Sequence, residues 1–256
     1  MSALLDAVID LVRQAGDIAR GKGLSSHVHV KGRSDFVTDA DLTVSNFLME
    51  RLPKLLPGST VLSEEKADEA RDDAPLFIID PIDGTTNLMY GMNLSAISCG
   101  LTVEGHPVLG VVYNPFTNEL FAAEKGAGAT LNGKPIHVCE DDCLHDALIG
   151  LEAGPATLDQ QRPFFDALFG LQQQVRALRM TGSAALDLCY IACGRLTGVA
   201  FHYLYPWDFA AGWLILEEAG GRLTAPANGT PSLKGLNTPL FASNGKIHDA
   251  LMEAFA

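Results

Sequence analysis

Apolar residues recur at helical spacing near the start of the chain. They lie three or four positions apart: Leu4, Val8, Leu11, Ala15 and Ile18. This spacing predicts a helix over residues 3–20 with one buried face. A similar pattern predicts a second helix over about 41–55, which Pro57 and Gly58 would end.

A strand pattern follows these helices. Residues 76–79, Leu-Phe-Ile-Ile, form a continuous apolar run that is typical of a strand buried on both faces. Turn residues separate the next apolar runs, and Asn132-Gly133 is a hairpin signal. The further strands expected here cover 96–103, 108–113 and 119–124.

Helices and strands mix again from about residue 139. The expected helices cover 163–171, 183–193, 208–219 and 246–255, and the expected strands 199–203, 222–224 and 240–243. Elements grouped in this way, without regular βαβ alternation, predict an α+β fold of layered sheets and helices. Because no repeat or long linker divides the chain, we expect a single domain over 1–256, with subdomains at 1–138 and 139–256.

The composition of the chain limits the kinds of molecule that it can bind. The chain has 256 residues, 47% of them hydrophobic, which is enough to bury one substantial core. Its formal net charge is −13, so sequence-independent binding to a nucleic acid polymer is unfavourable. A small phosphorylated metabolite remains a suitable partner, because bound cations can reverse the sign of the local charge.

The cysteines and the N-terminal segment indicate in which cellular compartment the protein is expected. The five cysteines are odd in number and sparse, which favours reduced thiols over a disulfide framework. Asp6, Asp10 and Arg13 interrupt the apolar residues that a signal peptide would need. No apolar stretch reaches the ~18 residues that span a bilayer. We therefore expect a cytoplasmic protein with no membrane partner.

The buried strand leads directly into a group of residues suited to metal and phosphate. Asp80 follows the apolar run, Pro81 is expected to end the strand, and Asp83 comes three positions after Asp80. Gly84 allows a sharp turn, and Thr85 begins a segment whose backbone N–H groups could bind phosphate. Two carboxylates at the mouth of a buried strand repel each other and lose hydration, and a divalent cation offsets both costs.

Other carboxylates follow or open neighbouring elements. Glu64 and Glu65 come after a short strand near residues 61–62, while Asp41 and Asp208 each open an expected helix. An Asp at such a position can be a simple helix cap. Four acidic segments in one chain favour a shared metal site over four unrelated caps.

Three stretches of the sequence resemble the inositol monophosphatase family. They are Asp80-Pro81-Ile82-Asp83-Gly84-Thr85-Thr86-Asn87, Trp207-Asp208-Phe209-Ala210-Ala211-Gly212 and Glu218-Ala219-Gly220-Gly221. The resemblance runs from about Lys31 to Asn244. It implies an αβαβα sandwich of the sugar-phosphatase type, a homodimer, two or three Mg²⁺ ions as cofactor, and inhibition by Li⁺.

The resemblance also implies roles for individual residues. The implied metal ligands are Glu64, Asp80, the carbonyl of Ile82, Asp83 and Asp208. Thr85, with Glu64 and Asp41, would position and deprotonate the attacking water, and the backbone of Gly84 and Thr85 would receive the phosphate. Glu65 would support the site, and Lys31 matches a basic residue on a segment near it.

The part of the site that holds the alcohol departs from the family pattern. The implied substrate contacts are Asp83, Gly182, Ser183, Ala184, Phe201 and Asp208. Inositol-specific relatives usually carry an acidic residue seven positions before the motif Asp, where this chain has Phe201, which cannot accept a hydrogen bond. We therefore expect Phe201 to shift preference away from inositol, towards a substrate with an apolar or planar face.

The expected function is Mg²⁺-dependent hydrolysis of a small phosphate monoester, similar to inositol 1-phosphate, by metal-activated water. Alternative esters are histidinol phosphate, fructose 1,6-bisphosphate and 3′-phosphoadenosine 5′-phosphate. A binding or regulatory protein on the same scaffold is a further alternative. A haloacid-dehalogenase-type phosphatase is disfavoured, because its motif has one residue between the two Asp residues and this chain has two, Pro81 and Ile82.

Overall fold

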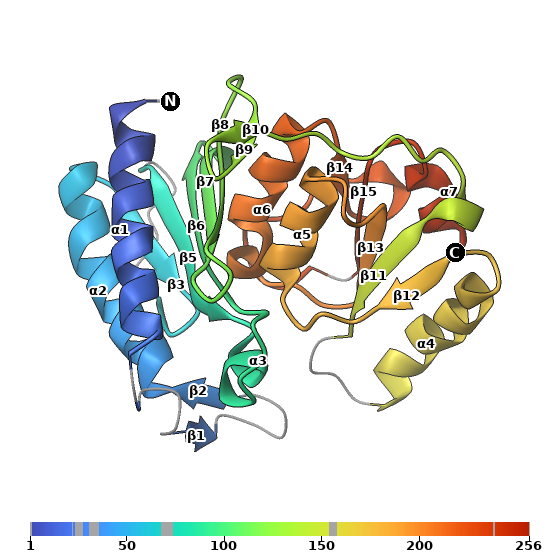
Figure 1. Ribbon diagram of the computed structural model, residues 1–256, viewed down its shortest axis with the longest axis horizontal. Helices are drawn as coiled ribbons and strands as arrows, with labels where there is room; N and C mark the ends of the chain where they lie inside the picture. The colour runs from blue at the N-terminus through green and yellow to red at the C-terminus, as the bar shows by residue number, and fades with distance from the viewer. Residues whose placement is uncertain are drawn as a thin grey trace.

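The computed structural model describes residues 2–21, 23, 28–30, 36–67, 74–153, 158–237 and 239–255. Helices and sheets alternate in layers across the molecule (Figure 1). From one side to the other, the helical layers are α1 (Ala3–Ala19) with α2 (Asp39–Leu55), α5 (Ala184–Ala192) with α6 (Pro206–Glu218), and α4 (Leu158–Gln172) with α7 (His248–Glu253). One sheet lies between each pair of helical layers, so the predicted αβαβα sandwich is confirmed.

The larger sheet lies between the first two helical layers. Its strands are β3 (Thr60–Ser63), β4 (Lys66–Ala67), β5 (Leu76–Asp83), β6 (Ala96–Val103), β7 (His106–Asn114), β8 (Glu119–Glu124), β9 (Ala129–Leu131) and β10 (Lys134–Pro135). Within the described residues their order is β10-β9-β8-β7-β6-β5-β3-β4, and only β3 and β5 pair in parallel. A short helix, α3 (Thr85–Met89), follows β5, and β1 (Val28–Val30) pairs with β2 (Phe36–Thr38) beside it.

The smaller sheet lies between the middle and last helical layers. Its strands are β11 (Leu148–Glu152), β12 (Ala177–Arg179), β13 (Gly198–Phe201), β14 (Arg222–Thr224) and β15 (Leu240–Ser243). Across the part of the chain that is described, the order is β12-β11-β13-β15-β14. β11 runs parallel to both of its neighbours, so the carboxyl ends of β11 and β13 lie side by side. Short 3₁₀ turns cover Leu144–Asp146 and Pro226–Asn228.

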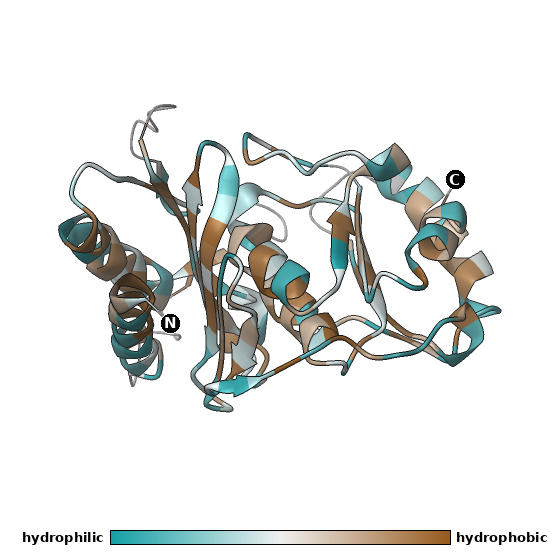
Figure 2. Cartoon of the chain, turned by 90° about the horizontal axis from the view of Figure 1, so that it is seen from above, coloured by the Kyte–Doolittle hydropathy of each residue, from teal (hydrophilic) through white to brown (hydrophobic). Residues whose placement is uncertain are grey.

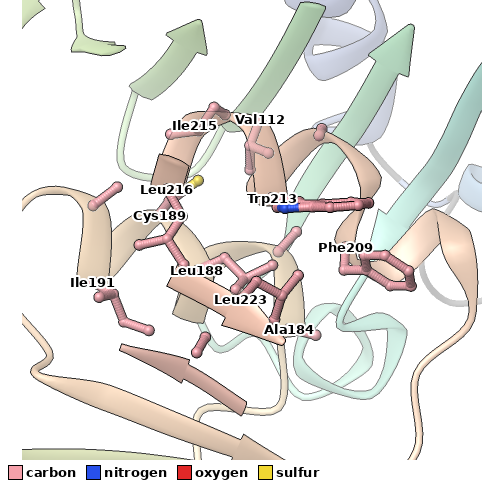
Figure 3. Packing of buried hydrophobic residues seen from close by; sticks show 14 of the residues in the cluster. Val112, Ala184, Leu188, Cys189, Ile191, Phe209, Trp213, Ile215, Leu216 and Leu223 are labelled. Atoms are coloured by element: carbon pink, nitrogen blue, oxygen red, sulfur yellow. The ribbon is translucent and has the colours of Figure 1, made fainter. Parts of the chain in front are cut away.

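Most residues of the two middle helices are buried, because both sheets pack against them. Leu188 and Cys189 of α5 share one apolar cluster with Trp213 and Leu216 of α6 (Figure 3). The close packing of α6 on the larger sheet depends on glycine, since a Cβ at Gly110 of β7 would lie 2.5 Å from a carbonyl oxygen of α6. The outer helices are banded with hydrophilic residues on the faces that no sheet covers (Figure 2).

The sequence predicted most of these elements, with small shifts. In α1 the face in contact with the sheet is rotated slightly, so that Leu5 and Val12 are fully buried while Leu4 and Leu11 are only partly covered. The prediction that Pro81 ends a strand is wrong, because β5 continues to Asp83. No helix in the described residues is long and apolar enough to cross a membrane.

Candidate active site

An open polar pocket of about 180 Å³ lies where β5, α3 and the start of α6 meet. Its lining residues are Phe36, Glu64, Asp80, Ile82, Asp83, Gly84, Thr85, Thr86, Gly182 and Asp208. All of the residues expected to ligate metal are among them. The two halves of the chain both contribute, since Gly182 and Asp208 come from the second half.

A β-bulge aims the two carboxylates of β5 into one place. Asp80 pairs with Ser98 of β6 and Asp83 pairs with Ala96, so three residues on β5 oppose a step of two on β6. Side chains three positions apart on a regular strand point to opposite faces, and the one extra residue of the bulge brings them to the same side. Both carboxylates are buried, and Asp80 Oδ1 accepts a hydrogen bond from the Ile82 backbone N–H at 3.0 Å.

Gly84 makes the turn that starts α3. Its φ of +88° is unfavourable for a residue with a Cβ, and a Cβ there would lie 2.8 Å from the Leu94 carbonyl oxygen and 3.0 Å from that of Gly182. The turn brings Thr85 and Thr86, the first residues of α3, to the pocket wall. The first N–H groups of a helix have no partner within the helix, so they can bind an anion there.

Asp41 lies behind Thr85 and does not line the pocket. Its carboxylate is fully buried, and its Oδ1 accepts a hydrogen bond from Thr85 Oγ1 at 2.9 Å. Its Oδ2 accepts from the backbone N–H and the hydroxyl of Thr38, in a capping box at the start of α2. Asp41 therefore takes part in capping its helix and also holds the Thr85 hydroxyl.

Asp83 and Asp208 are held by the second half of the chain. Asp83 Oδ2 accepts hydrogen bonds from Ser183 Oγ at 2.5 Å and from the Ala185 N–H at 2.8 Å, at the start of α5. Asp208 Oδ2 accepts from the Tyr205 N–H at 2.6 Å, which caps α6. Each carboxylate thus has one oxygen fixed by the protein, which limits how its other oxygen can be directed.

The electrostatics of the pocket favour a cation. Burial, followed by the charges of Glu64 and Asp83, raises the pKa of Asp80 well above its usual range. Burial also raises the pKa of Asp83 to about 6, and burial and the charge of Asp83 raise the pKa of Asp208. Carboxylates that are this poorly solvated gain most from a divalent cation, and an all-oxygen donor set fits Mg²⁺.

The carboxylates are close enough to repel one another but have not closed into a coordination shell. Among the residues that the structure describes, no three His, Cys, Asp or Glu side chains already form a metal-binding group. Their oxygens bond instead to hydroxyl and backbone N–H groups.

Other predicted residues lie around or outside this pocket. Glu65 is half-buried and does not line it, and Ala184 is buried at the start of α5. Lys31 lies outside the described residues. The expectation that Phe201 contacts substrate is wrong, because its side chain is fully buried in the apolar cluster around α5 and α6, at the end of β13.

Sequence reasoning missed three residues near the site. Phe36 and Thr86 line the pocket, and Glu152 accepts a hydrogen bond from the N–H of pocket residue Gly182. Glu152 could have been found, because it ends an apolar run, Leu-Ile-Gly-Leu, just as Asp80 does. The strand that carries it, β11, was not predicted, so its carboxylate was not considered.

Comparisons with known proteins identify the family of this chain. A sequence model of the inositol monophosphatase family matches residues 1–256. Inositol-1-monophosphatase from Synechocystis is 40% identical over 91% of this chain and 82% of its own length. Inositol monophosphatase 3 from Solanum lycopersicum is 38% identical over 98% of this chain and 95% of its own length.

Solved structures show the same fold over the same extent. The crystal structure of the extragenic suppressor protein suhB from Bartonella henselae superposes with a TM-score of 0.92, at 33% identity over 99% of this chain and 98% of that one. The matching family is generally metal-dependent and acts on small phosphorylated substrates. The chain therefore belongs to the inositol monophosphatase family and is a phosphoric monoester hydrolase.

Proposed function

We propose that this chain is a Mg²⁺-dependent phosphatase that hydrolyses inositol 1-phosphate or a closely similar small phosphate monoester, with water as the nucleophile. The observation that carries the proposal is the convergence of carboxylates from three separate segments, those of Glu64, of Asp80 with Asp83, and of Asp208, on one open pocket beside the start of α3. A binding protein would gain nothing from this set of mutually repelling acids, whereas a cation-dependent enzyme requires it.

The pocket offers ligands for more than one ion. Glu64, Asp80 and the Ile82 carbonyl would hold the first, and Asp80, Asp83 and Asp208 the second, with a weaker third ion near Glu64. Bound Mg²⁺ supplies a water of lowered pKa and neutralises charge on the phosphate and on the departing alkoxide. Li⁺ is expected to inhibit by competing for one of these positions.

The protein side chains orient the reactants. Thr85 Oγ1 is held between Asp41 Oδ1 at 2.9 Å and the Ile82 carbonyl oxygen at 3.1 Å, so its position at the pocket wall is fixed. We propose that Thr85 and Glu64 orient the attacking water and that its proton passes through the Thr85 hydroxyl to Asp41. The N–H groups of Gly84 and Thr85 would hold the phosphate in line for attack.

Substrate choice must come from the pocket residues that can reach the alcohol. Because Phe201 is buried, it cannot present a face to the substrate. Asp83, Asp208 and the turn at Gly182 and Ser183 remain as proposed contacts. These are polar groups, which suits a polyhydroxylated alcohol such as inositol and disfavours an apolar one.

The test is phosphate release from inositol 1-phosphate, histidinol phosphate, fructose 1,6-bisphosphate and 3′-phosphoadenosine 5′-phosphate, with and without Mg²⁺. We expect Mg²⁺-dependent release, fastest with inositol 1-phosphate, suppressed by Li⁺ and lost in Asp208→Asn. Folded wild type that releases no phosphate at any Mg²⁺ concentration would contradict the proposal and favour a binding role. Light scattering on the same sample tests the expected homodimer.

A further inference from the structure

The turn that precedes α5 is held from two sides. From the first half of the chain, Asn87 Nδ2 donates to the carbonyl oxygens of Thr181 and Leu94 at 2.8 and 2.7 Å. From the second half, Glu152 Oε1 accepts the Gly182 N–H at 2.7 Å. The turn itself needs glycine at its centre, where φ is +76°. One short segment is thus fixed between the two sheets.

The turn at residues 181–183 also determines where Asp83 lies. Ser183, the next residue, donates its hydroxyl to Asp83 Oδ2 at 2.5 Å, and the Ala185 N–H donates to the same oxygen at 2.8 Å. A shift of the turn would move the Ser183 hydroxyl, which is one of the two donors to Asp83 Oδ2. The path from Glu152 to the pocket is therefore continuous: carboxylate, Gly182 amide, Ser183 hydroxyl, Asp83 carboxylate.

Glu152 is itself held firmly in place. It ends β11 directly beside Phe201 of β13, and its carbonyl oxygen accepts the His202 N–H at 2.8 Å. A second buried carboxylate, Asp187, accepts Thr181 Oγ1 at 2.8 Å with its Oδ1. Within the described residues, Oδ2 of Asp187 has no hydrogen-bond partner.

Burying the carboxyl groups of Glu152 and Asp187 lowers the stability of the folded chain. Burial raises the pKa of Glu152 to about 7, and burial and the charge of Glu152 raise the pKa of Asp187 well above its usual range. Strained electrostatics of this kind concentrate at functional sites.

We infer that Glu152 is a positioning residue: by accepting the Gly182 N–H it fixes the turn at 181–183, and through Ser183 it sets the orientation in which Asp83 binds the cation. The inference rests on the proposed function, since it assumes that Asp83 is a ligand. Glu152 does not line the pocket, so it acts through the turn and not by touching substrate. Ser183 is the direct hydrogen-bond partner of Asp83, and altering such partners of metal ligands typically changes metal affinity or activity by about 10–100-fold.

Two substitutions distinguish the effect of the length of the Glu152 side chain from the effect of its charge. Glu152→Gln keeps an acceptor oxygen at the same distance but removes the carboxylate charge. Glu152→Asp keeps the charge but is one methylene group shorter, and the strand pairing of β11 prevents the backbone from moving to compensate. We expect both variants to fold.

A matched control exists on α6. Glu218 accepts the N–H groups of Gly126 and Gly128 at 2.7 and 2.8 Å, so it also braces a glycine turn with its carboxylate. It lies ten residues along the helix from Asp208, about 15 Å at the rise of an α-helix. Glu218→Asp therefore loses a comparable contact away from the pocket.

The measurement is Mg²⁺ affinity by calorimetry, together with the Mg²⁺ concentration that gives half-maximal phosphate release. We expect Glu152→Asp to need at least about 10-fold more Mg²⁺ than wild type for half-maximal phosphate release. The Mg²⁺ requirement of Glu152→Gln and of Glu218→Asp should stay near that of wild type. Equal Mg²⁺ affinities for Glu152→Asp and Glu152→Gln, or a greater loss in Glu152→Gln, would overturn the inference. A wild type that binds no Mg²⁺ would instead overturn the proposed function itself.

Discussion

Replacing Asp83 by Asn should make the metal-free protein more stable, although it removes a proposed ligand. In the absence of a cation, the charged carboxylate is buried among other acids, and its pKa rises from the ordinary 3.8 to about 6. The folded state therefore binds a proton more tightly than the unfolded state does. For an acid whose pKa is raised by folding, stability is complete below the unfolded pKa and is lost as the pH rises through the folded pKa.

The size of the effect follows from this pKa. A rise from 3.8 to about 6 corresponds to about 3 kcal/mol of unfolding free energy, lost once the pH exceeds the folded pKa. The Asn side chain carries no charge, and its amide oxygen can still accept from Ser183 and Ala185. Burying the new amide nitrogen costs about 1 kcal/mol. We therefore expect Asp83→Asn to be more stable than wild type by about 2 kcal/mol above the folded pKa.

Saturating Mg²⁺ should reverse that order. Binding stabilises the folded wild type by about 2.7 kcal/mol at 100 times the dissociation constant, and Asp83→Asn should lose most of that gain. The assay is urea unfolding of both proteins, with a chelator and with Mg²⁺, at several pH values between about 4 and 8. If Asp83→Asn is the less stable protein in chelator near pH 8, or if the difference does not shrink towards pH 4, the electrostatic reasoning is wrong.

Substitutions at three further positions test the roles assigned to Thr85, Gly84 and Phe201. Thr85→Val should lower kcat about 100-fold with little change in KM, because it removes the hydroxyl held by Asp41, and Thr85→Ser should restore most of the rate. Gly84→Ala should abolish turnover, since a Cβ there lies 2.8 Å from the Leu94 carbonyl oxygen at a φ of +88°; activity near wild type would show that the turn is not fixed. Phe201→Ala should lower the unfolding free energy by about 3–5 kcal/mol in urea titrations and leave the order of substrates unchanged, because Phe201 is a core residue.

The sequence predicted the layered fold because its elements carry strong local signals. The helical spacing that begins at Leu4 and the apolar run of β5 were sufficient for α1 and the central strand. β11 was missed because it is short and its apolar residues fit a helix or a strand equally well. The extension of β5 beyond Pro81 depends on a bulge against β6, which no local pattern specifies.

Only part of the candidate site, like only part of the fold, could be predicted from the sequence. Carboxylates that follow directly after an apolar run, such as Asp80, could be found from the chain alone, and the structure gathers them at one pocket. The role of Phe201 could not, since the side to which a residue at a strand end points depends on the packing of α5 and α6. The contribution of Glu152 depends on its hydrogen bond to Gly182, which is 30 residues away in sequence.

The most direct test of the central claim is to locate the cation. Crystals of the wild type grown with Mn²⁺ in place of Mg²⁺ would show each bound ion by its anomalous scattering. We predict peaks in the pocket, ligated by oxygens of Asp80, Asp83 and Asp208, and loss of the peak at Asp83 in Asp83→Asn. Mn²⁺-supported phosphate release without any peak among these carboxylates would contradict the account.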